Sequence, residues 1–450
     1  MTDTVQAAQK TTAILARHVG HEPAAAWVHT AAVYSNAHHL GLVDGPDRPD
    51  PRHAAEVLAT SHPLLAGFAD PAVNRAWTAT PPADALGAVT DLWSGHNVGD
   101  PPNRPAGHPL GDLYQALSTE ARKGRALVQT PKFVADLLLD LGLDPVVRQH
   151  GEAVRMIDPA CGTGHILVEA AMWLYATRHL PSERSADRVA RALNAVHGVD
   201  LDPYAALVAR YRLLVLACRA SGRRLDQVGD MPVHVAAANS LLDRAEPMLT
   251  RGRYHAAVAN PPYITVKDPA LNAAIRAAYP QVCHGQYSLG LPFTALMHDL
   301  VVPGGWVTQI TGNSFMKREF GKKFIEDYLP RFDLRWVIDT SGAYIPGHGT
   351  PTVILVTRNR RPVGDKVHAV LGKRGEPSRP ADPARGVVWT AIVDAVREVL
   401  AFDALAAGAA RAVAERDGVV DLPVATGPED PAVEPGPAGQ VALFDVEGAA

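Results

Sequence analysis

A glycine-containing turn between an expected strand and an expected helix constrains the fold of this chain more than any other feature. The segment Asp158–Gly164 reads DPACGTG, follows the apolar run 154–157 (VRMI) and precedes the apolar run 166–175 (ILVEAAMWLY). Glycines at a strand–helix turn let a ligand approach the backbone, and the first N–H groups of the helix are free to bind it. Taken alone, the pattern also fits a simple tight turn.

Short β-branched runs alternate with helical runs through the middle of the chain. Seven strands are expected, at Val154–Asp158, Val196–Asp200, Val233–Ala237, His255–Ala259, Trp306–Ile310, Leu334–Asp339 and Thr352–Thr357. Helices separate most of them, which predicts an α/β fold with a Rossmann-like, doubly wound, mostly parallel sheet of seven strands. Only the last two strands are joined by a loop, so we expect them to form an antiparallel pair.

The chain divides into five expected regions. Residues 1–98 are expected to be helical and carry no chemical motif, and the Pro/Gly-rich residues 99–109 are expected to be a linker. The α/β alternation fills 110–361, and a basic segment with a short helical extension follows at 362–422. Residues 423–450 are rich in Pro, Gly and Ala and acidic, so we expect a disordered tail.

Composition narrows the classes of function. The hydrophobic fraction is 47% and the formal net charge is −4, so neither a disordered chain nor a polybasic coat protein is expected. Three scattered cysteines exclude a disulfide framework and a zinc cluster, and we expect no metal. No signal peptide and no apolar run of 18 residues is present, so we expect a cytoplasmic protein without a membrane span. Basic residues gather locally, at 317–323 and 358–385.

A second acid strengthens the interpretation of the glycine turn. Asp200 ends the next expected strand, where a carboxylate is placed to hold ribose hydroxyls. The turn lacks the GxGxxG pattern, and no arginine is placed to bind phosphates. This favours a nucleoside without a pyrophosphate, such as S-adenosylmethionine, over NAD.

The segment Asn260-Pro261-Pro262-Tyr263 follows the fourth expected strand and indicates the class of reaction. Two prolines stiffen the backbone, so the Asn260 side chain and a proline carbonyl can both accept hydrogen bonds from one planar amine. Accepting both protons localises the nitrogen lone pair for in-line attack on a sulfonium methyl. Tyr263 can stack on the ring that bears the amine.

These motifs, in this order and on these strands, resemble the adenine-N6 DNA methyltransferases. The segment Gln129–Val134 (QTPKFV) resembles the element that precedes the glycine turn in type I modification subunits and in fused restriction–modification enzymes. Val302–Phe315 and Ala343–Ile354 resemble the family's fifth strand and its base-pocket loop with the last strand. Within the family, the phage-growth-limitation (BREX-type) methylases are the most similar. The resemblance covers about residues 110–388.

The resemblance implies a role for each matching residue. It implies cofactor binding by Thr130, Pro131, Asp158, Pro159, Ala160, Gly162, Gly164, Asp200 and Asn239, and catalysis by Asn260, Pro261, Pro262 and Tyr263. Thr130 and the glycine turn would hold the methionine half of the cofactor, and Asp200 its ribose. Asn239 stands where the family usually has Asp, so we expect weaker cofactor binding. The second stacking position of the family falls on Ile345, beside Tyr344. Thr130 is also expected to cap the helix that follows it.

Several partners and alternatives follow from the sequence. The resemblance implies double-stranded DNA with a flipped adenine as substrate. About 90 residues follow Arg361, so we expect a specificity or defence-complex subunit to supply sequence choice. Gln440–Phe444 (QVALF) resembles peptides that bind the replication sliding clamp. Two alternatives stay open: an NPPY methyltransferase acting on a protein glutamine or a ribosomal RNA guanine, and a non-catalytic DNA-binding subunit derived from a methylase.

Overall fold

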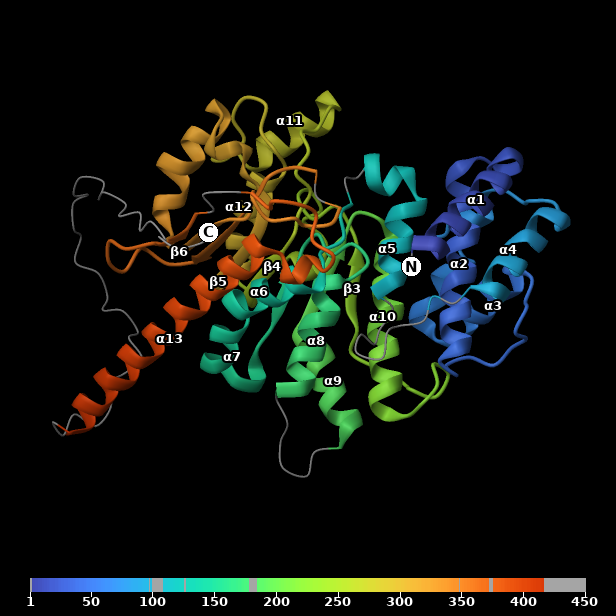
Figure 1. The fold of residues 1–450 in the computed structure, drawn as a ribbon, viewed down its shortest axis with the longest axis horizontal. Coiled ribbons are helices and arrows are strands. Elements are labelled where there is room, and N and C mark those ends of the chain that lie inside the picture. Colours follow the sequence, from blue (N-terminus) through green and yellow to red (C-terminus); the bar gives the residue numbers. More distant parts are fainter. Residues whose placement is uncertain are drawn as a thin grey trace.

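The structure is a computed structural model that describes residues 2–96, 98, 108–124, 127–177, 184–347, 349–371 and 375–416. A sheet with helices packed on both faces forms its centre (Figure 1). The expected linker at 99–109 lies outside the described residues except for His108 and Pro109, which begin helix α5 (His108–Leu117). The expected disordered tail and the expected clamp-binding peptide, Gln440–Phe444, lie wholly outside them.

The described strands form one sheet of eight, in the order β3-β2-β1-β4-β5-β7-β6-β8. They are β1 (Met156–Asp158), β2 (Val196–Asp200), β3 (His234–Ala237), β4 (Tyr254–Ala259), β5 (Val301–Gly312), β6 (Asp333–Asp339), β7 (Thr352–Arg358) and β8 (His368–Val370). The α/β class is confirmed, and all seven expected strands are present. The expected number of strands is wrong by one, because β8 has only three residues and shows no readable alternation.

The direction of β7 decides which residues share an edge of the sheet. Strands β1 to β5 pair in parallel, whereas β7 lies between β5 and β6 and is antiparallel to both, which confirms the expected antiparallel pair. We call the edge that contains Asp158, Asp200 and Ala259 the carboxyl edge, and the opposite one the amino edge. Because β7 runs backwards, its last residue, Arg358, pairs with Trp306 towards the amino edge.

Alternating side chains bury the sheet on both faces. In β4, Ala256 and Val258 belong to one apolar cluster, and Ala257 and Ala259 belong to another. The first cluster includes α6 (Lys132–Gly142), α8 (His165–Thr177), α9 (Ser185–Ala195) and α10 (Pro203–Ser221), and the second includes α11 (Pro269–Ala278) and α12 (Gly290–Leu300). Strands buried on both faces are typical of parallel sheets between helical layers.

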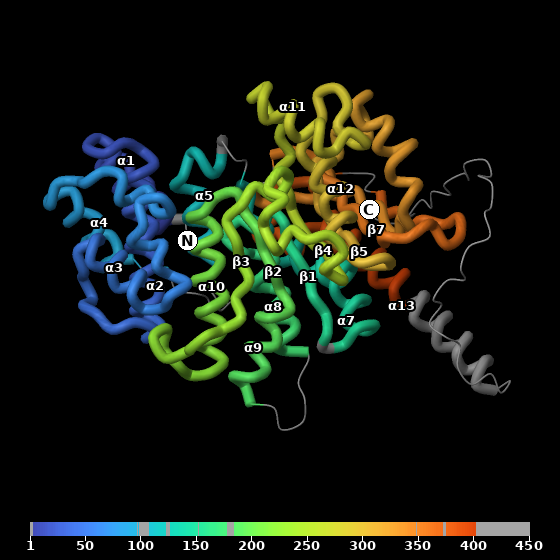
Figure 2. Tube along the Cα trace, turned by 180° about the vertical axis from the view of Figure 1, so that it is seen from behind, coloured from blue at the N-terminus to red at the C-terminus, as the bar shows by residue number. Residues whose placement is uncertain are grey.

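The N-terminal helices form a compact group beside α10, at the end of the molecule away from α13 (Val387–Arg416), as Figures 1 and 2 both show. They are α1 (Thr2–Val19), α2 (His21–His39), α3 (Pro51–Ser61) and α4 (Ala83–Gly95). Helix α7 (Asp144–His150) is not part of this group and directly follows α6 in the sheet domain. In α2, His29 joins the group to the sheet domain: its Nδ1 lies 2.9 Å from the Tyr204 hydroxyl, and its Nε2 lies 2.8 Å from the Leu110 carbonyl oxygen.

Candidate active site

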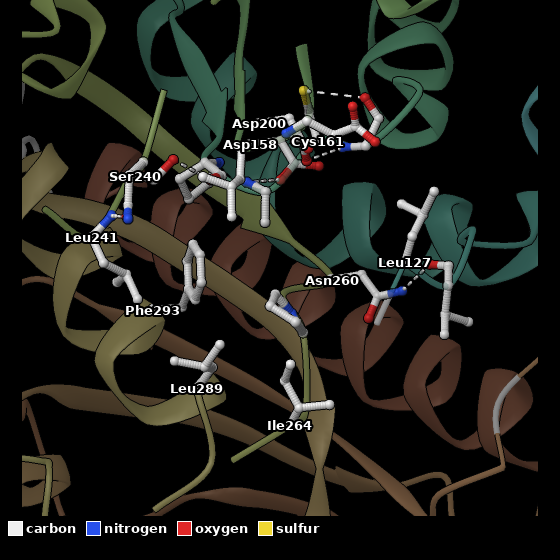
Figure 3. Close-up of a pocket in the computed structure, with 18 of the residues that line it drawn as sticks. Leu127, Asp158, Cys161, Asp200, Ser240, Leu241, Asn260, Ile264, Leu289 and Phe293 are labelled. Atoms are coloured by element: carbon white, nitrogen blue, oxygen red, sulfur yellow. Dashed lines mark hydrogen bonds between the residues drawn. The ribbon is translucent and has the colours of Figure 1, made fainter. Parts of the chain in front are cut away.

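A cavity of about 740 Å³ opens at the carboxyl edge, where the glycine turn, the end of β2 and the end of β4 meet. Figure 3 shows Asp158, Asp200 and Asn260 along one side of it and the apolar side chains of Leu289 and Phe293 along the other. The cavity therefore offers hydrogen-bonding groups on one wall and an apolar surface on the opposite wall, as small-molecule sites commonly do.

The glycine turn is held against β2 by backbone hydrogen bonds to Asp200. The Gly162 N–H donates to Asp200 Oδ2 over 2.7 Å, and the Asp202 N–H donates to Asp200 Oδ1 over 2.8 Å. Gly162 and Gly164 have φ values of 53° and 82°, a left-handed conformation that glycine adopts without steric cost. A Cβ atom on Gly162 would also lie 2.8 Å from Leu127 Cδ1, so a larger residue there would be strained and would displace the Leu127 side chain.

Asp158 is a buried carboxyl group facing the cavity, with 2% of its surface exposed. Its Oδ1 accepts a 3.0 Å hydrogen bond from the Ala160 N–H. Burial raises the pKa of Asp158 to about 8, with a smaller contribution from the nearby charge of Asp200, although the Ala160 hydrogen bond opposes the rise. A buried acid with unused acceptor capacity suits a ligand that brings amino or hydroxyl donors.

Asn239 also lines the cavity, at the end of β3. Its side-chain oxygen accepts a 3.2 Å hydrogen bond from the Leu241 N–H and so holds the turn that follows β3. An oxygen with two lone pairs retains one for a ligand. Asn239 is therefore placed where the motif predicts a ligand contact, with its oxygen oriented by the backbone.

The NPPY segment leaves β4 directly at the cavity. Asn260 Nδ2 donates to Thr130 Oγ1 over 3.0 Å and to the Val128 carbonyl oxygen over 3.3 Å. The Tyr263 hydroxyl donates to Asn260 Oδ1, and burial raises the pKa of Tyr263, so this hydroxyl stays protonated. Pro262 lines the cavity beside Asn260, and Pro261 is buried.

Most of the residues predicted from the motifs meet in this cavity. Those that line it are Thr130, Asp158, Pro159, Ala160, Gly162, Asp200, Asn239, Asn260 and Pro262. Gly164 turns the chain into α8, Pro131 precedes α6, and Tyr263 reaches the site through its bond to Asn260. The expected capping role of Thr130 is wrong: α6 begins at Lys132 after Pro131 without a side-chain cap, because the Thr130 hydroxyl is bonded to Asn260 instead.

The sequence analysis missed the apolar wall and one buried polar group. Leu201, Leu241 and Phe293 line the cavity, and Leu201 is 56% exposed although it is a large apolar residue. That exposure next to Asp200 could have been inferred from an apolar residue between two acids at a strand end. His165, also at the cavity, has a buried Nε2 with no hydrogen-bond partner among the described residues, and burial lowers its pKa.

The two basic clusters lie differently. Lys317 and Arg318 follow the end of β5 at the carboxyl edge and are exposed. Arg358 and Arg360 lie at the amino edge, where Arg358 donates to the Gly304 carbonyl oxygen over 3.0 Å and Arg360 pairs with Asp333 over 2.7 Å. The basic residues at the end of β7 are therefore distant from the cavity and engaged within the fold.

The described residues contain neither a metal-binding cluster nor a membrane-spanning helix. Within the described ranges, no three His, Cys, Asp or Glu side chains gather closely enough to hold a metal ion. Nor does any described helix combine the length and apolarity that crossing a membrane requires.

Comparison with known proteins identifies sequence relatives of this chain. Residues 194–345 match the family model of the Eco57I restriction-modification methylases. The adenine-specific methyltransferase PglX of Streptomyces coelicolor is 44% identical over 334 residues, which are 64% of this chain and 28% of PglX. The adenine-specific methyltransferase BrxX of Escherichia coli is 34% identical over 130 residues, 28% of this chain and 10% of BrxX. The chain thus spans less than a third of the length of these curated relatives.

Solved structures share the fold at low sequence identity. A modification subunit of a putative type I restriction enzyme from Vibrio vulnificus matches with a TM-score of 0.51 and 15% identity, covering 80% of this chain and 82% of that one. The type IIL restriction-modification enzyme MmeI, solved in complex with DNA, matches with a TM-score of 0.57 and 14% identity, covering 84% and 61%. The resemblance inferred from the motifs is thereby confirmed: this chain is similar in sequence to the adenine-specific methyltransferases PglX and BrxX, and residues 194–345 match the Eco57I-type methylases.

Proposed function

We propose that this chain transfers the methyl group of S-adenosylmethionine to the N6 amine of adenine in DNA. The observation that carries the proposal is that Asn260 and the acid pair Asp158 and Asp200 line one cavity. A methyl-transfer site of this kind needs an amide that accepts hydrogen bonds from the target amine and carboxyl groups that bind the nucleoside of the cofactor.

The cofactor half has the donor and acceptor groups that S-adenosylmethionine needs. S-Adenosylmethionine supplies a methyl group bound to a positively charged sulfur. Asp200 would accept from the ribose hydroxyls, and the buried acid Asp158 would accept from the amino group. Leu201, Leu241 and Phe293 would bury the faces of the adenine ring, which accounts for an apolar wall opposite two carboxyls.

The substrate half acts through Asn260 and the proline backbone. Asn260 Oδ1 and the Pro261 carbonyl oxygen would each accept one proton of the target N6 amine. This holds the amine so that its lone pair points along the line of methyl transfer. Tyr263 would stack on the adenine once the base has left the duplex, and stacking of this kind contributes about 1–3 kcal/mol per base. The two consecutive prolines restrict the backbone, which keeps both acceptors in place before the base arrives.

Duplex DNA would approach the carboxyl edge, because a flipped base must reach Asn260. The exposed Lys317 and Arg318 lie at that edge and would contact phosphates. We also propose that a specificity or defence-complex subunit selects the target sequence. The protein would act in restriction–modification or phage defence in the cytoplasm. Binding of Gln440–Phe444 to the sliding clamp is a separate prediction that does not depend on this proposal.

One assay separates this proposal from its alternatives. The chain is incubated with S-adenosylmethionine labelled in the methyl group and with DNA, RNA and protein acceptors, and the products are hydrolysed to nucleosides and amino acids. We expect the label in N6-methyladenine from DNA. Label in guanine or glutamine would support the other NPPY methyltransferases instead. Tight cofactor and DNA binding with no transfer to any acceptor would indicate a non-catalytic subunit.

A further inference from the structure

The side-chain amide of Asn260 has two ends of similar shape and opposite chemistry. Its oxygen accepts hydrogen bonds, and its NH₂ group donates them. A target amine that must give up both protons to acceptors needs the oxygen to face it. With the amide turned by 180°, two donors would meet and the amine could not be held. The orientation of this amide therefore decides whether the site works.

The contacts of Asn260 define that orientation. Nδ2 lies 3.0 Å from Thr130 Oγ1 and 3.3 Å from the Val128 carbonyl oxygen. A carbonyl oxygen can only accept, so the Val128 contact is compatible with Nδ2 and incompatible with Oδ1 at that position. Thr130 is 4% exposed, so its hydroxyl lies largely away from bulk solvent. Both amide protons thus have acceptors on the segment that precedes α6.

The oxygen of the Asn260 amide, at the other end of the side chain, has a hydrogen-bond donor as its neighbour. The Tyr263 hydroxyl donates to Asn260 Oδ1, and Tyr263 lies against Gly312, since a Cβ on Gly312 would be 3.5 Å from the Tyr263 Cβ. A donor therefore already occupies the acceptor that the target amine would use. The target amine would take the place of the Tyr263 hydroxyl at this oxygen when the base binds.

We propose that Thr130, together with the Val128 carbonyl, is a positioning residue that fixes the Asn260 amide with its oxygen towards the target amine. The effect of this contact on methyl transfer rests on the proposed function, whereas the contact between Thr130 and Asn260 does not. Thr130 then acts on the methyl-accepting half of the site, besides lining the cofactor cavity. The motif TP and the motif NPPY, 130 residues apart, form one unit through this bond.

The test compares three threonine variants. Thr130→Val removes the acceptor and keeps the shape of the side chain, and Thr130→Ser restores the acceptor. Thr308→Val is the matched control, because Thr308 is buried in β5 and its Oγ1 has no hydrogen-bond partner among the described residues. At saturating S-adenosylmethionine, Thr130→Val should lower kcat about tenfold, as the loss of one buried hydrogen bond predicts, while Thr130→Ser and Thr308→Val stay near the parent protein. The affinity for S-adenosylmethionine should stay within about twofold of the parent value in Thr308→Val, and kcat is compared at saturating cofactor because Thr130 also lines the cofactor cavity.

A second readout does not depend on methyl transfer. In protein labelled with ¹⁵N at asparagine, the side-chain amide signals of Asn260 are assigned from their loss in Asn260→Ala. Those signals should shift and exchange faster with solvent in Thr130→Val, and should stay in place in Thr130→Ser and Thr308→Val. Unchanged amide signals in Thr130→Val would overturn the inference, as would a loss of cofactor affinity with kcat retained. If the parent protein methylates no DNA, the proposed function fails, and the amide signals still decide this inference.

Discussion

Two buried carboxyl groups at opposite edges of the sheet show what marks a site. Asp333, at the amino edge, is 4% exposed and is paired with Arg360 over 2.7 Å. Asp158, at the carboxyl edge, is 2% exposed and faces a cavity, and burial together with the neighbouring Asp200 raises its pKa. A buried carboxylate with a guanidinium partner has its charge compensated within the fold, whereas a buried carboxyl group without a cation is free to accept hydrogen bonds from a ligand. Burial alone therefore does not distinguish the two edges; the absence of a counterion in the described surroundings does.

The largest expected effect comes from removing the amine acceptor at the carboxyl edge. Asn260→Ala should lower methyl transfer about 100- to 1,000-fold, as expected for a group that binds the reacting atoms in the transition state. Cofactor affinity should persist, because Asp158 and Asp200 remain. Single-turnover transfer of labelled methyl and calorimetric binding measure the two quantities. His255→Ala, at the other end of the same strand, is the control and should leave turnover unchanged; near-parental turnover in Asn260→Ala would show that the amine is bound elsewhere.

The carboxyl edge could be predicted from sequence because its motifs combine rare residue types with strand ends. The turn at Asp158–Gly164, Asp200 and NPPY each follow a strand, and strand ends meet at one edge of a parallel sheet. Leu201 and Phe293 were missed because apolar residues look the same in a core and in a ligand wall. The Thr130–Asn260 bond was missed because it depends on tertiary packing between distant segments.

The amino edge was predicted less well, although the signal was present. The basic cluster at 358–385 by itself would suggest a DNA contact, but the antiparallel strand β7 returns the start of this cluster to the amino edge. The expected antiparallel pair already implied that Arg358 and Arg360 lie away from the ligand. The number of charges in a segment carries no information on strand direction. The charge pattern and the strand order therefore have to be read together to place these arginines.

The second largest effect concerns the cofactor. Asp200→Ala removes a charged acceptor and also frees the Gly162 N–H, which Asp200 now holds over 2.7 Å. Affinity for S-adenosylmethionine should fall about 10- to 100-fold, since hydrogen bonds to charged groups contribute about 1.5–3 kcal/mol. Asp333→Ala sharpens the comparison: it should lower the thermal midpoint of unfolding while cofactor affinity, measured by calorimetry, stays the same. Unchanged affinity in both Asp200→Ala and Gly162→Val would remove this site.

The third effect is a pH dependence that arises from Asp158. Its pKa rises from the model-compound value of 3.8 to about 8 on folding, so the folded state binds the extra proton between these values. Stability from this group is therefore fully present below about pH 4 and is lost as the pH rises through about 8. A positively charged ligand favours the carboxylate, so cofactor binding should release a proton below pH 8, and affinity should rise with pH by up to about tenfold per unit. Calorimetry in buffers of different ionisation enthalpy measures this release. Asp158→Asn should abolish it and Asp333→Asn should not; a pH-independent affinity in the parent protein would contradict the assignment.

The smallest effect tests which edge faces DNA. Lys317 and Arg318 are exposed at the carboxyl edge, and the salt bridges found in the described residues include neither of them. Replacing both by Gln should weaken duplex binding about three- to tenfold and lower the slope of log affinity against log salt by up to about two units, because each lost phosphate contact removes about 0.9. Arg361→Gln with Lys366→Gln is the matched control, since both residues are exposed near the amino edge and carry the same charge. Fluorescence anisotropy over a range of salt concentrations gives both slopes. Equal losses in the two double variants would mean that DNA covers both edges, and no loss in either would assign DNA binding to a partner subunit. Only a larger loss in the Lys317 and Arg318 variant keeps the carboxyl edge as the DNA face.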